Sequence, residues 1–291
     1  MDVCATREKK LREEKSSNNE QGGPPRVAAS SYLNSAPLLW SFARGARRGE
    51  IELLTDAAPS RCADLLARGE AEAALVPVIE YQRLPETAVV RGVCVGARTE
   101  VQSVVLVTWG KPLEEIESVA LDTSSRTSAA LVEVIFREFA HCAPRLVPSA
   151  PNLTEMLRAH DAALLIGDPA MTFPREGLRV YDMAALWRSF TGLGFVFAMW
   201  MAHEGARARV EKIDFAGARD EGLALVEVIA AEYERELGRP REELVKYLRE
   251  NICFELDEEM RAGLELFFRL AHKHGVTQQF RPLRFLDGSD V

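Results

Sequence analysis

The sequence has few cysteines, no long apolar run and no excess of positive charge. Its five cysteines include no C-x-x-C pair and are widely scattered, which disfavours a zinc site or a disulfide framework and indicates a reducing compartment. The net charge of −8 argues against a nucleic-acid-binding protein, because such binding needs a basic face. No stretch approaches the roughly 18 apolar residues that span a bilayer, so we expect no membrane partner.

Several familiar catalytic motifs are also missing. The sequence contains no H-E-x-x-H, G-x-S-x-G or Walker motif. No G-x-G-x-x-G follows the first predicted strand, so we expect no dinucleotide cofactor. Because H-E-x-x-H is also missing, we expect no metal. Residues 1–25 are charged and polar and lack the apolar segment of a secretory signal, which predicts a disordered extension on a cytoplasmic protein.

What the sequence does have is a regular alternation of short apolar runs and helical segments from Arg26 to Met201. This alternation predicts βαβ units, and continuous apolar runs such as Ala162–Ile166 are typical of buried parallel strands. After Met201 the pattern is helical only, with one long helix expected over 206–237. We therefore expect a two-lobed α/β fold with mostly parallel sheets covered by helices and a ligand cleft between the lobes.

The order of these segments also predicts how the chain is divided. The chain builds most of lobe one, crosses to lobe two and returns, with Val101–Trp109 and Phe195–Met201 as the crossing strands. The predicted units are the extension 1–25, lobe one over 26–106 plus 200–291, and lobe two over 107–199.

The loop Asp122–Ser128 is the strongest candidate for a binding site. It joins a predicted strand to a predicted helix and carries Ser124, Ser125, Arg126 and Thr127. Free N–H groups at a helix N-terminus favour an anion, and an arginine can bind a carboxylate through two hydrogen bonds. Ordinary helix capping explains the same residues. Both interpretations stay open at the level of composition.

Four other segments carry polar groups at strand ends or turns. Tyr32 and Asn34 follow the first strand and would face the cleft, although Asn34 could instead cap a helix. Asp168 is explained as a helix cap before a proline, and Gly167 would allow a close approach of the backbone. The Gly-rich turn from Thr191 suits either a hinge or a plain loop. Glu80 is a candidate general base if it is buried, and otherwise a capping or surface carboxylate.

Taken in order, seven stretches match one family pattern. They are Tyr32-Leu-Asn34 with Pro37-Leu38, Ile79-Glu-Tyr81, Ser103-Val-Val-Leu106, Leu121–Ser128, Leu164–Ala170, Thr191-Gly-Leu193 with Phe195–Phe197, and Ala262–Phe268. Together they resemble the chorismate dehydratase family of the futalosine route to menaquinone. The resemblance implies a type 2 periplasmic-binding-protein fold, in agreement with the expected crossing and return of the chain.

The resemblance also implies a reaction and a set of site residues. The reaction removes water from chorismate, a dicarboxylate, without a cofactor and gives 3-[(1-carboxyvinyl)oxy]benzoate. The general base is left open between the side-chain carboxylate of the substrate and Glu80. By resemblance, Asn34 and Ser103 surround the reacting carbons, Ser124, Ser125, Arg126 and Thr127 hold a carboxylate, and Tyr32, Asp168, Thr191 and Gly192 line the cleft.

The sequence departs from the family pattern in two places and leaves rival functions open. Pro77-Val78 stands where many members carry a serine, and Gly194 replaces a proline. One rival is a non-catalytic intracellular binding protein or sensor for a small carboxylate, because a fold does not fix an activity. The other is the dihydroxynaphthoate-forming synthase of the same pathway, which fits Asp122–Ser128 less well. A homodimer is compatible with the sequence.

Overall fold

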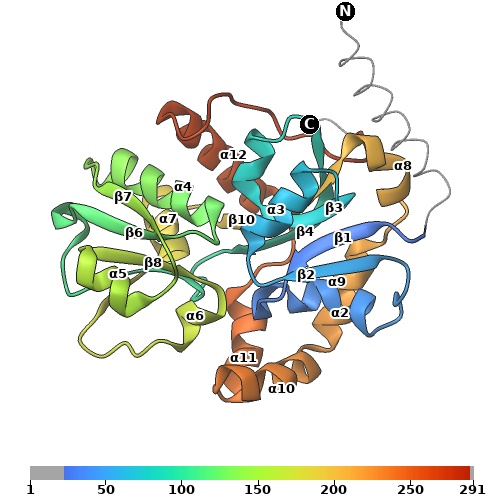
Figure 1. Cartoon of the computed structure of the whole chain (residues 1–291), viewed down its shortest axis with the longest axis horizontal. Helices are drawn as coiled ribbons and strands as arrows, with labels where there is room; N and C mark the ends of the chain where they lie inside the picture. Colours follow the sequence, from blue (N-terminus) through green and yellow to red (C-terminus); the bar gives the residue numbers. More distant parts are fainter. Residues whose placement is uncertain (1–22, 289–291) are drawn as a thin grey trace, which may run out of the picture.

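The structure, a computed structural model, describes residues 23–288. Within this range the strands form two five-stranded sheets, and Figure 1 shows each sheet in its own lobe with helices packed around it. We call the first sheet with its helices lobe one and the second sheet with its helices lobe two. Most of the predicted N-terminal extension, residues 1–22, lies outside the described residues.

The sheet of lobe one has the strand order β2-β1-β3-β10-β4. β1 pairs in parallel with β2 and β3, whereas β10 is antiparallel to both β3 and β4. Every residue of β3 is buried, as its continuous apolar sequence predicts for an inner strand. The strands are β1 (Arg26–Ser30), β2 (Glu52–Asp56), β3 (Ala73–Pro77), β4 (Thr87–Ala97) and β10 (Phe195–His203).

The sheet of lobe two repeats this plan in the order β7-β6-β8-β5-β9. β6 is parallel to β7 and β8, and β5 is antiparallel to β8 and β9. Each sheet thus has four strands in one direction and one reversed strand. The sequence did not predict the reversal, because a strand buried on both faces has the same apolar pattern in either direction. The strands are β5 (Val104–Thr108), β6 (Ser118–Asp122), β7 (Arg145–Ser149), β8 (Ala162–Ile166) and β9 (Arg179–Asp182).

The chain crosses between the sheets in two short segments, 98–103 and 192–194. The strand after each crossing, β5 or β10, is the reversed strand of the sheet that it enters. The predicted unit boundaries at 106/107 and 199/200 cut through β5 and β10, and each of these strands lies wholly in one sheet.

The helices of lobe one follow the prediction except in the C-terminal third. The prediction of a single helix over 206–237 is wrong, because the segment forms separate helices with a break at Asp214. The Asp214 carboxylate caps α9 by accepting from the Gly217 N–H at 2.8 Å. α9 packs on α2, and a Cβ at Gly222 would lie 1.9 Å from the Pro37 carbonyl oxygen, so this contact requires glycine. The elements are η1 (Leu33–Ser35), α2 (Ala36–Ala43), α3 (Pro59–Ala67), η2 (Val78–Gln82), η5 (Glu204–Ala206), α8 (Arg207–Val210), α9 (Phe215–Ala224), α10 (Val226–Leu237), α11 (Arg241–Lys246), η6 (Tyr247–Asn251) and α12 (Glu258–Lys273).

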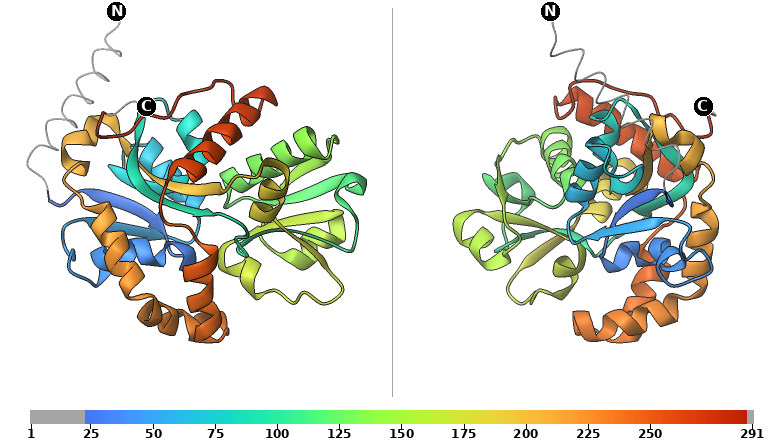
Figure 2. Two further views of the ribbon diagram at one scale, coloured as in Figure 1. Left: turned by 180° about the vertical axis from the view of Figure 1, so that it is seen from behind. Right: turned by 45° about the vertical axis from the view of Figure 1, so that its right-hand side comes forward.

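The helices of lobe two cover both faces of its sheet (Figure 1). α12 of lobe one lies beside α4 and β10, which Figure 2 shows from behind, so it spans the boundary between the lobes. The helix that the sequence predicts after the Asp122–Ser128 loop ends in a π-helical turn. The elements are η3 (Leu113–Glu115), α4 (Arg126–Val134), the π-turn η4 (Ile135–Phe139), α5 (Leu153–Ala159), α6 (Gly167–Thr172) and α7 (Met183–Thr191).

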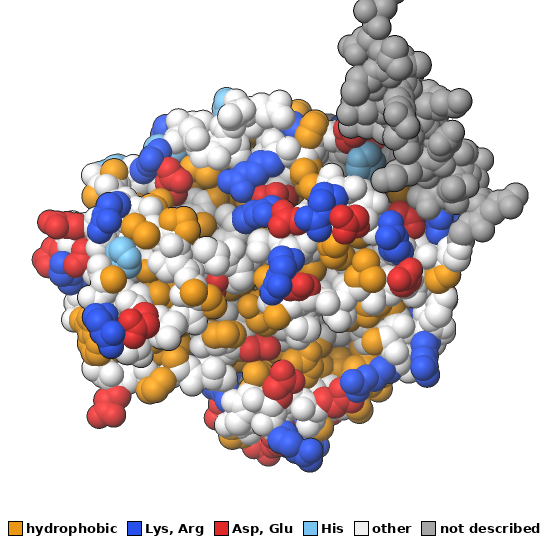
Figure 3. All heavy atoms as spheres, in the orientation of Figure 1, with side chains coloured by type: hydrophobic (Ala, Val, Ile, Leu, Met, Phe, Trp, Pro, Cys, Tyr) orange, Lys and Arg blue, Asp and Glu red, His pale blue; other side chains and the backbone are white. Residues whose placement is uncertain are grey.

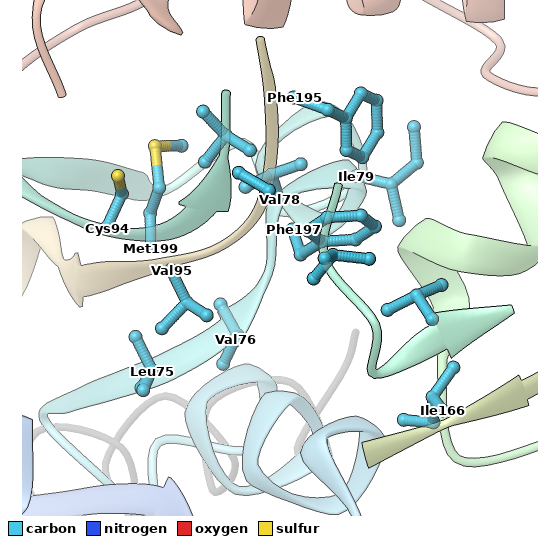
Figure 4. Close-up of a cluster of buried hydrophobic side chains, with 14 of the residues drawn as sticks. Leu75, Val76, Val78, Ile79, Cys94, Val95, Ile166, Phe195, Phe197 and Met199 are labelled. Atoms are coloured by element: carbon cyan, nitrogen blue, oxygen red, sulfur yellow. The ribbon is translucent and has the colours of Figure 1, made fainter. Parts of the chain in front are cut away.

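The hydrophobic core runs continuously between the lobes. Figure 4 shows side chains of β3, β4 and β10, among them Val76, Val95 and Phe197, gathered on the side where Ile166 of β8 enters from lobe two. On the face drawn in Figure 3, basic and acidic side chains are intermixed, without a large patch of either sign. No helix among the described residues is long and apolar enough to cross a membrane.

Candidate active site

A small cavity lies between the two lobes, where strands β1, β3 and β8 end. Its volume is about 50 Å³. The apolar part of the wall comes from both sheets and includes Leu75, Val104, Ile166 and Phe197. The polar part consists of hydroxyl and amide side chains at strand ends and helix starts, namely Ser30, Tyr32, Asn34, Ser35, Ser125 and Ser128.

The loop Asp122–Ser128 supplies both a helix cap and part of this cavity wall. Ser125 is the N-cap of α4: its Oγ accepts from the Ser128 N–H at 3.3 Å and donates to the Ser128 Oγ at 2.7 Å. Both hydroxyls line the cavity. The two interpretations drawn from the sequence are therefore compatible, because the capping residues themselves face the cleft.

The Asp122 carboxylate lies just behind this wall. Its Oδ1 accepts from the backbone N–H of Ser124 at 2.8 Å and from the Ser124 hydroxyl. Its Oδ2 is buried and has no hydrogen-bond partner among the described residues. Burial raises the pKa of Asp122, and the hydrogen bonds from Ser124 oppose that shift.

Arg126 does not point into the cavity. Its guanidinium crosses to lobe one and binds the Glu80 carboxylate at 3.0 Å and the Asp64 carboxylate at 2.6 Å. Glu80, the candidate base, has a side chain only 5% exposed and is also paired with Arg83 at 2.9 Å. The structure therefore brings Arg126 and Glu80 together as an ion pair between the lobes, and neither lines the cavity.

Other predicted residues also hold the lobes together or shape a turn. The Thr127 hydroxyl accepts from the Ile79 N–H at 3.2 Å, and the Ser124 carbonyl accepts from the Ser60 N–H at 3.2 Å. Thr191 and Gly192 end α7, where Gly192 adopts a φ of 73°. Neither of these two residues is part of the cavity wall.

Asp168 faces lobe one instead of capping its own helix. The predicted cap is wrong, because α6 begins at Gly167 and its N-cap, Ile166, has no side-chain cap bond. The Asp168 Oδ1 accepts from the backbone N–H of Leu33 at 3.1 Å. Burial raises the pKa of Asp168 to about 6.

Tyr32 closes one side of the cavity against Gly167. Gly167 has a φ of 64°, and a Cβ there would lie 2.6 Å from a carbon of the Tyr32 ring. Glycine at this position therefore makes room for the Tyr32 ring, and the predicted approach of the Gly167 backbone to a ligand stays a prediction. Burial raises the pKa of the Tyr32 hydroxyl.

Asn34 and Ser103, the predicted catalytic pair, have different partners: the Asn34 Oδ1 accepts from the Ser35 hydroxyl at 3.2 Å, and Ser103 is bonded to Tyr247. The Tyr247 hydroxyl donates to the Ser103 Oγ at 2.8 Å. Asn34 lines the cavity, whereas Ser103 is fully buried behind it. Sequence reasoning missed Tyr247, since it lies in a helical segment without any motif.

Ser103 is positioned by a strained turn in the first crossing. Gln102 has a φ of 59°, and the Ser103 N–H bonds to the Val101 carbonyl at 2.7 Å, which makes a γ-turn of the rare positive-φ kind. The Asp182 carboxylate holds this turn, because it accepts from the backbone N–H of Val101 and of Gln102, the latter at 2.6 Å. Asp182 also caps α7 and was not singled out from the sequence, although an Asp before a helix is a recognisable capping signal.

No metal centre is evident in the described part of the chain. Among residues 23–288, no group of three or more His, Cys, Asp or Glu side chains could hold a metal ion. The four cysteines within this range, Cys62, Cys94, Cys142 and Cys253, are free. The polar side chains that line the cavity carry hydroxyl and amide groups, which can form hydrogen bonds.

Comparison with solved structures defines the class of protein. The fold matches that of an Archaeoglobus fulgidus protein with a TM-score of 0.71 at 17% identity, covering 88% of this chain and 100% of that one. It also matches the periplasmic aliphatic sulphonate binding protein SsuA from Escherichia coli, with a TM-score of 0.60 at 15% identity, covering 93% of this chain and 96% of SsuA. The chain thus has the two-lobed fold of periplasmic binding proteins.

Comparison of sequences identifies the family. Residues 25–273 match the family model described as menaquinone biosynthesis. The chain is 32% identical over 232 residues to a curated chorismate dehydratase from Thermus thermophilus, covering 72% of this chain and 83% of that protein. The chain belongs to this menaquinone biosynthesis family.

Proposed function

We propose that this protein is a hydro-lyase that removes water from chorismate and releases 3-[(1-carboxyvinyl)oxy]benzoate, a step in menaquinone biosynthesis. The observation that carries this proposal is the 32% identity to a chorismate dehydratase over most of both chains. The cavity between the lobes, with Asn34 in its wall, supplies a site for the reaction.

The chemistry of chorismate sets what the site must do. The proton at C3 is allylic and conjugated through the ring diene to a carboxylate, and its loss with the C4 hydroxyl makes the ring aromatic. The protein must therefore hold two carboxylates, orient the C3–H bond and hydrogen-bond the departing hydroxyl. Each of these tasks needs oriented hydrogen-bond donors.

One substrate carboxylate fits the N-terminus of α4. Ser125 and Ser128 present hydroxyls to the cavity there, and the helix N-terminus favours negative charge. Among the described residues that line the cavity there is no Arg or Lys, so this binding rests on neutral donors. We therefore assign Ser125 and Ser128 to the carboxylate and give Arg126 the separate role of joining the lobes.

The base that fits best is the side-chain carboxylate of the substrate. Both oxygens of Glu80 are engaged by Arg83 and Arg126, and Glu80 is not part of the cavity wall. In the proposed step the substrate carboxylate takes the C3 proton, the C4–O bond breaks, and the departing hydroxide takes up that proton and leaves as water. Asn34 donates a hydrogen bond to the departing oxygen.

The cleft must open to admit this substrate. A cavity of about 50 Å³ has room for only a few water molecules. Opening breaks the bonds between the lobes, namely Leu33 to Asp168, Ile79 to Thr127 and Arg126 to its two carboxylates. We propose that closing over chorismate re-forms them and excludes water from the elimination.

The test is turnover of chorismate by the purified protein in EDTA, with the product followed by chromatography. The proposal expects 3-[(1-carboxyvinyl)oxy]benzoate to form and Asn34→Ala to stop its formation. Binding of chorismate, measured by calorimetry, without any product would reject the enzyme and favour a sensor of small carboxylates.

Two further features go with this function. We propose a cytoplasmic location, which the biosynthetic role supports and cell fractionation tests. The homodimer that the sequence allows stays a prediction, and light scattering coupled to gel filtration would measure the mass in solution.

A further inference from the structure

The two crossings between the lobes differ in backbone strain. Gln102 in the first crossing has a φ of 59°, in the left-handed region that a residue with a Cβ adopts only at a cost. Gly192, at the start of the second crossing, has a φ of 73°, which glycine adopts without a steric penalty. The strain is therefore concentrated at Gln102. Such strain persists only where the surrounding structure enforces it, and it clusters at clamps and switch regions.

Both lobes hold Gln102. Its backbone N–H donates to the Asp182 carboxylate of lobe two at 2.6 Å. Its side-chain Nε2 donates to the Asn251 Oδ1 of η6 in lobe one at 3.0 Å. Asn251 is only 6% exposed, and its own amide donates to the carbonyl of Glu100 in the same crossing at 3.4 Å. A rotation of one lobe against the other must therefore break one of these bonds or change the backbone dihedral angles at Gln102.

The turn at Gln102 also leads directly to the cavity wall. The carbonyl of Ser103, the next residue, accepts from the Gly167 N–H at 2.7 Å. Gly167 lines the cavity and precedes Asp168, whose carboxylate accepts from the Leu33 N–H of lobe one. Two hydrogen bonds thus connect the strained turn to a contact that holds the cleft closed.

We propose that Gln102 is the hinge of the first crossing and that its strain opposes closing of the lobes and favours their reopening for product release. Hinges are residues that absorb changes in φ and ψ. Because Gln102 is fixed to a different lobe on each side, the angle between the lobes sets its dihedral angles, and opening the cleft relieves the strain. The inference rests on the proposed function, in which closing over chorismate assembles the site.

Replacement by glycine and by alanine separates the strain from the side chain. Gln102→Ala removes the bond to Asn251 and keeps the strained φ, whereas Gln102→Gly removes both the bond and the strain. His141 provides a matched control, because it is the other non-glycine residue of the described range with a positive φ, at 51°. It lies in the loop between η4 and β7, outside both crossings. His141→Ala and His141→Gly form the control pair.

Hydrogen exchange of two backbone amides reports closure without any ligand. The N–H groups of Leu33 and Ile79 donate across the cleft to Asp168 and Thr127, so each is protected while the lobes are closed. Followed by NMR, both amides should exchange roughly 5- to 30-fold more slowly in Gln102→Gly than in Gln102→Ala, the factor that corresponds to the cost of a left-handed residue.

The control pair should behave differently. Both glycine variants should have a higher Tm than their alanine partners, because each relieves the same kind of strain. The exchange of the two amides across the cleft should nevertheless be the same in His141→Gly and His141→Ala. This comparison separates an effect on closure from an effect on overall stability.

Binding of the reaction product tests the same hinge with a ligand that is not turned over. The Kd of 3-[(1-carboxyvinyl)oxy]benzoate, measured by calorimetry, should be lower in Gln102→Gly than in Gln102→Ala, by up to about 30-fold. Its dissociation rate, measured by stopped flow, should be lower as well, because the relaxed hinge no longer favours reopening.

The exchange experiment gives the decisive outcomes. Equal exchange of Leu33 and Ile79 in the two Gln102 variants would overturn the inference, and so would an equal slowing in the His141 pair. If the slowing is seen but the wild type does not turn over chorismate, the dehydration fails and the hinge stands. If chorismate is turned over and the exchange is unchanged, the hinge is rejected and the dehydration stands.

Discussion

The backbone N–H of Leu33 in lobe one donates to the carboxylate of Asp168 in lobe two, with 3.1 Å between nitrogen and oxygen. The bond lies next to Tyr32 and Gly167, two residues of the cavity wall. It is one of the contacts that hold the cleft closed. The acceptor is a largely buried carboxyl group, so the strength of this hydrogen bond depends on whether Asp168 is protonated.

Asp168 should make the free energy of unfolding of the protein decrease as the pH rises from about 4 to about 6. Its pKa is raised from 3.8 to about 6 by burial, so the folded state retains a proton that the unfolded state has released. Its favourable contribution is complete below the unfolded pKa and is lost as the pH rises through the folded pKa. Asp168→Asn keeps an acceptor for Leu33 without a charge. Above pH 6 it should therefore gain at most about 3 kcal/mol relative to the wild type.

Urea unfolding of both proteins at pH 4.5 and pH 7 measures this difference. The free energy of unfolding of the variant minus that of the wild type should increase with pH. A difference that is the same at both pH values would show that Asp168 does not titrate in this window.

Arg126→Ala should weaken the closed state without removing a direct contact to the substrate. The change leaves the nearly buried Glu80 carboxylate with Arg83 as its remaining partner, which should cost about 1–3 kcal/mol of stability. KM should rise because closing the lobes becomes less favourable. Thermal unfolding and steady-state kinetics on chorismate measure the two effects.

Asp64→Asn is the discriminating variant for this prediction. Asp64 binds Arg126 from lobe one and is not part of the cavity wall. If Arg126 acts by joining the lobes, Asp64→Asn should also raise KM and should add little to Arg126→Ala. If Arg126 instead contacts the substrate carboxylate, Asp64→Asn should leave KM unchanged.

Gly167→Ala should abolish turnover through the position of Tyr32. The new methyl group would lie within 2.6 Å of the Tyr32 ring, which must then move from the cavity wall. The positive φ adds about 1–2 kcal/mol of backbone strain. Gly177→Ala is a matched control, because Gly177 has a φ of 72° with no atom within 4 Å of the added Cβ. Equal kcat/KM in the two variants would show that the Tyr32 contact is unimportant.

Ser125→Ala should affect both stability and substrate binding. It removes the N-cap of α4, at a cost of about 0.5–2 kcal/mol, and also removes a hydroxyl from the cavity wall. Asn152→Ala removes the corresponding cap of α5, which accepts from the Glu155 N–H at 3.3 Å and lies outside the cavity wall. Only Ser125→Ala should weaken chorismate binding, as measured by calorimetry. A similar loss of affinity in Asn152→Ala would attribute the effect to stability alone.

The fold was largely predictable from the sequence because its main signals are local. The alternation of apolar runs and helical segments located most strands, and β8 begins and ends at the predicted residues, Ala162 and Ile166. The reversed direction of β5 and β10 was not predictable, since direction depends on the neighbouring strands. The break at Asp214 was missed because charge-laced helical composition continues on both sides of it.

The site was predictable as a set of segments but not as a set of contacts. Ser125 and Asn34 line the cavity as expected, because strand ends and helix starts meet between the lobes. Arg126 and Glu80 carry the right chemistry for a substrate ligand and a base, yet each is neutralised across the cleft by a partner far away in the sequence. Tyr247 gave no local signal, since its hydrogen bond to Ser103 joins residues 144 positions apart.

The reversed strands also set the order in which the protein can fold as it is synthesised. The sheet of lobe two is continuous in the sequence and is complete once Asp182 has left the ribosome. In lobe one, β3 and β4 lie on either side of β10 and cannot be joined until Phe195–His203 has emerged. The sheet of lobe two can therefore form first. Until β10 has emerged, the edges of β3 and β4 that will pair with it are unpaired. During this interval the nascent lobe one is most exposed to aggregation and to chaperones.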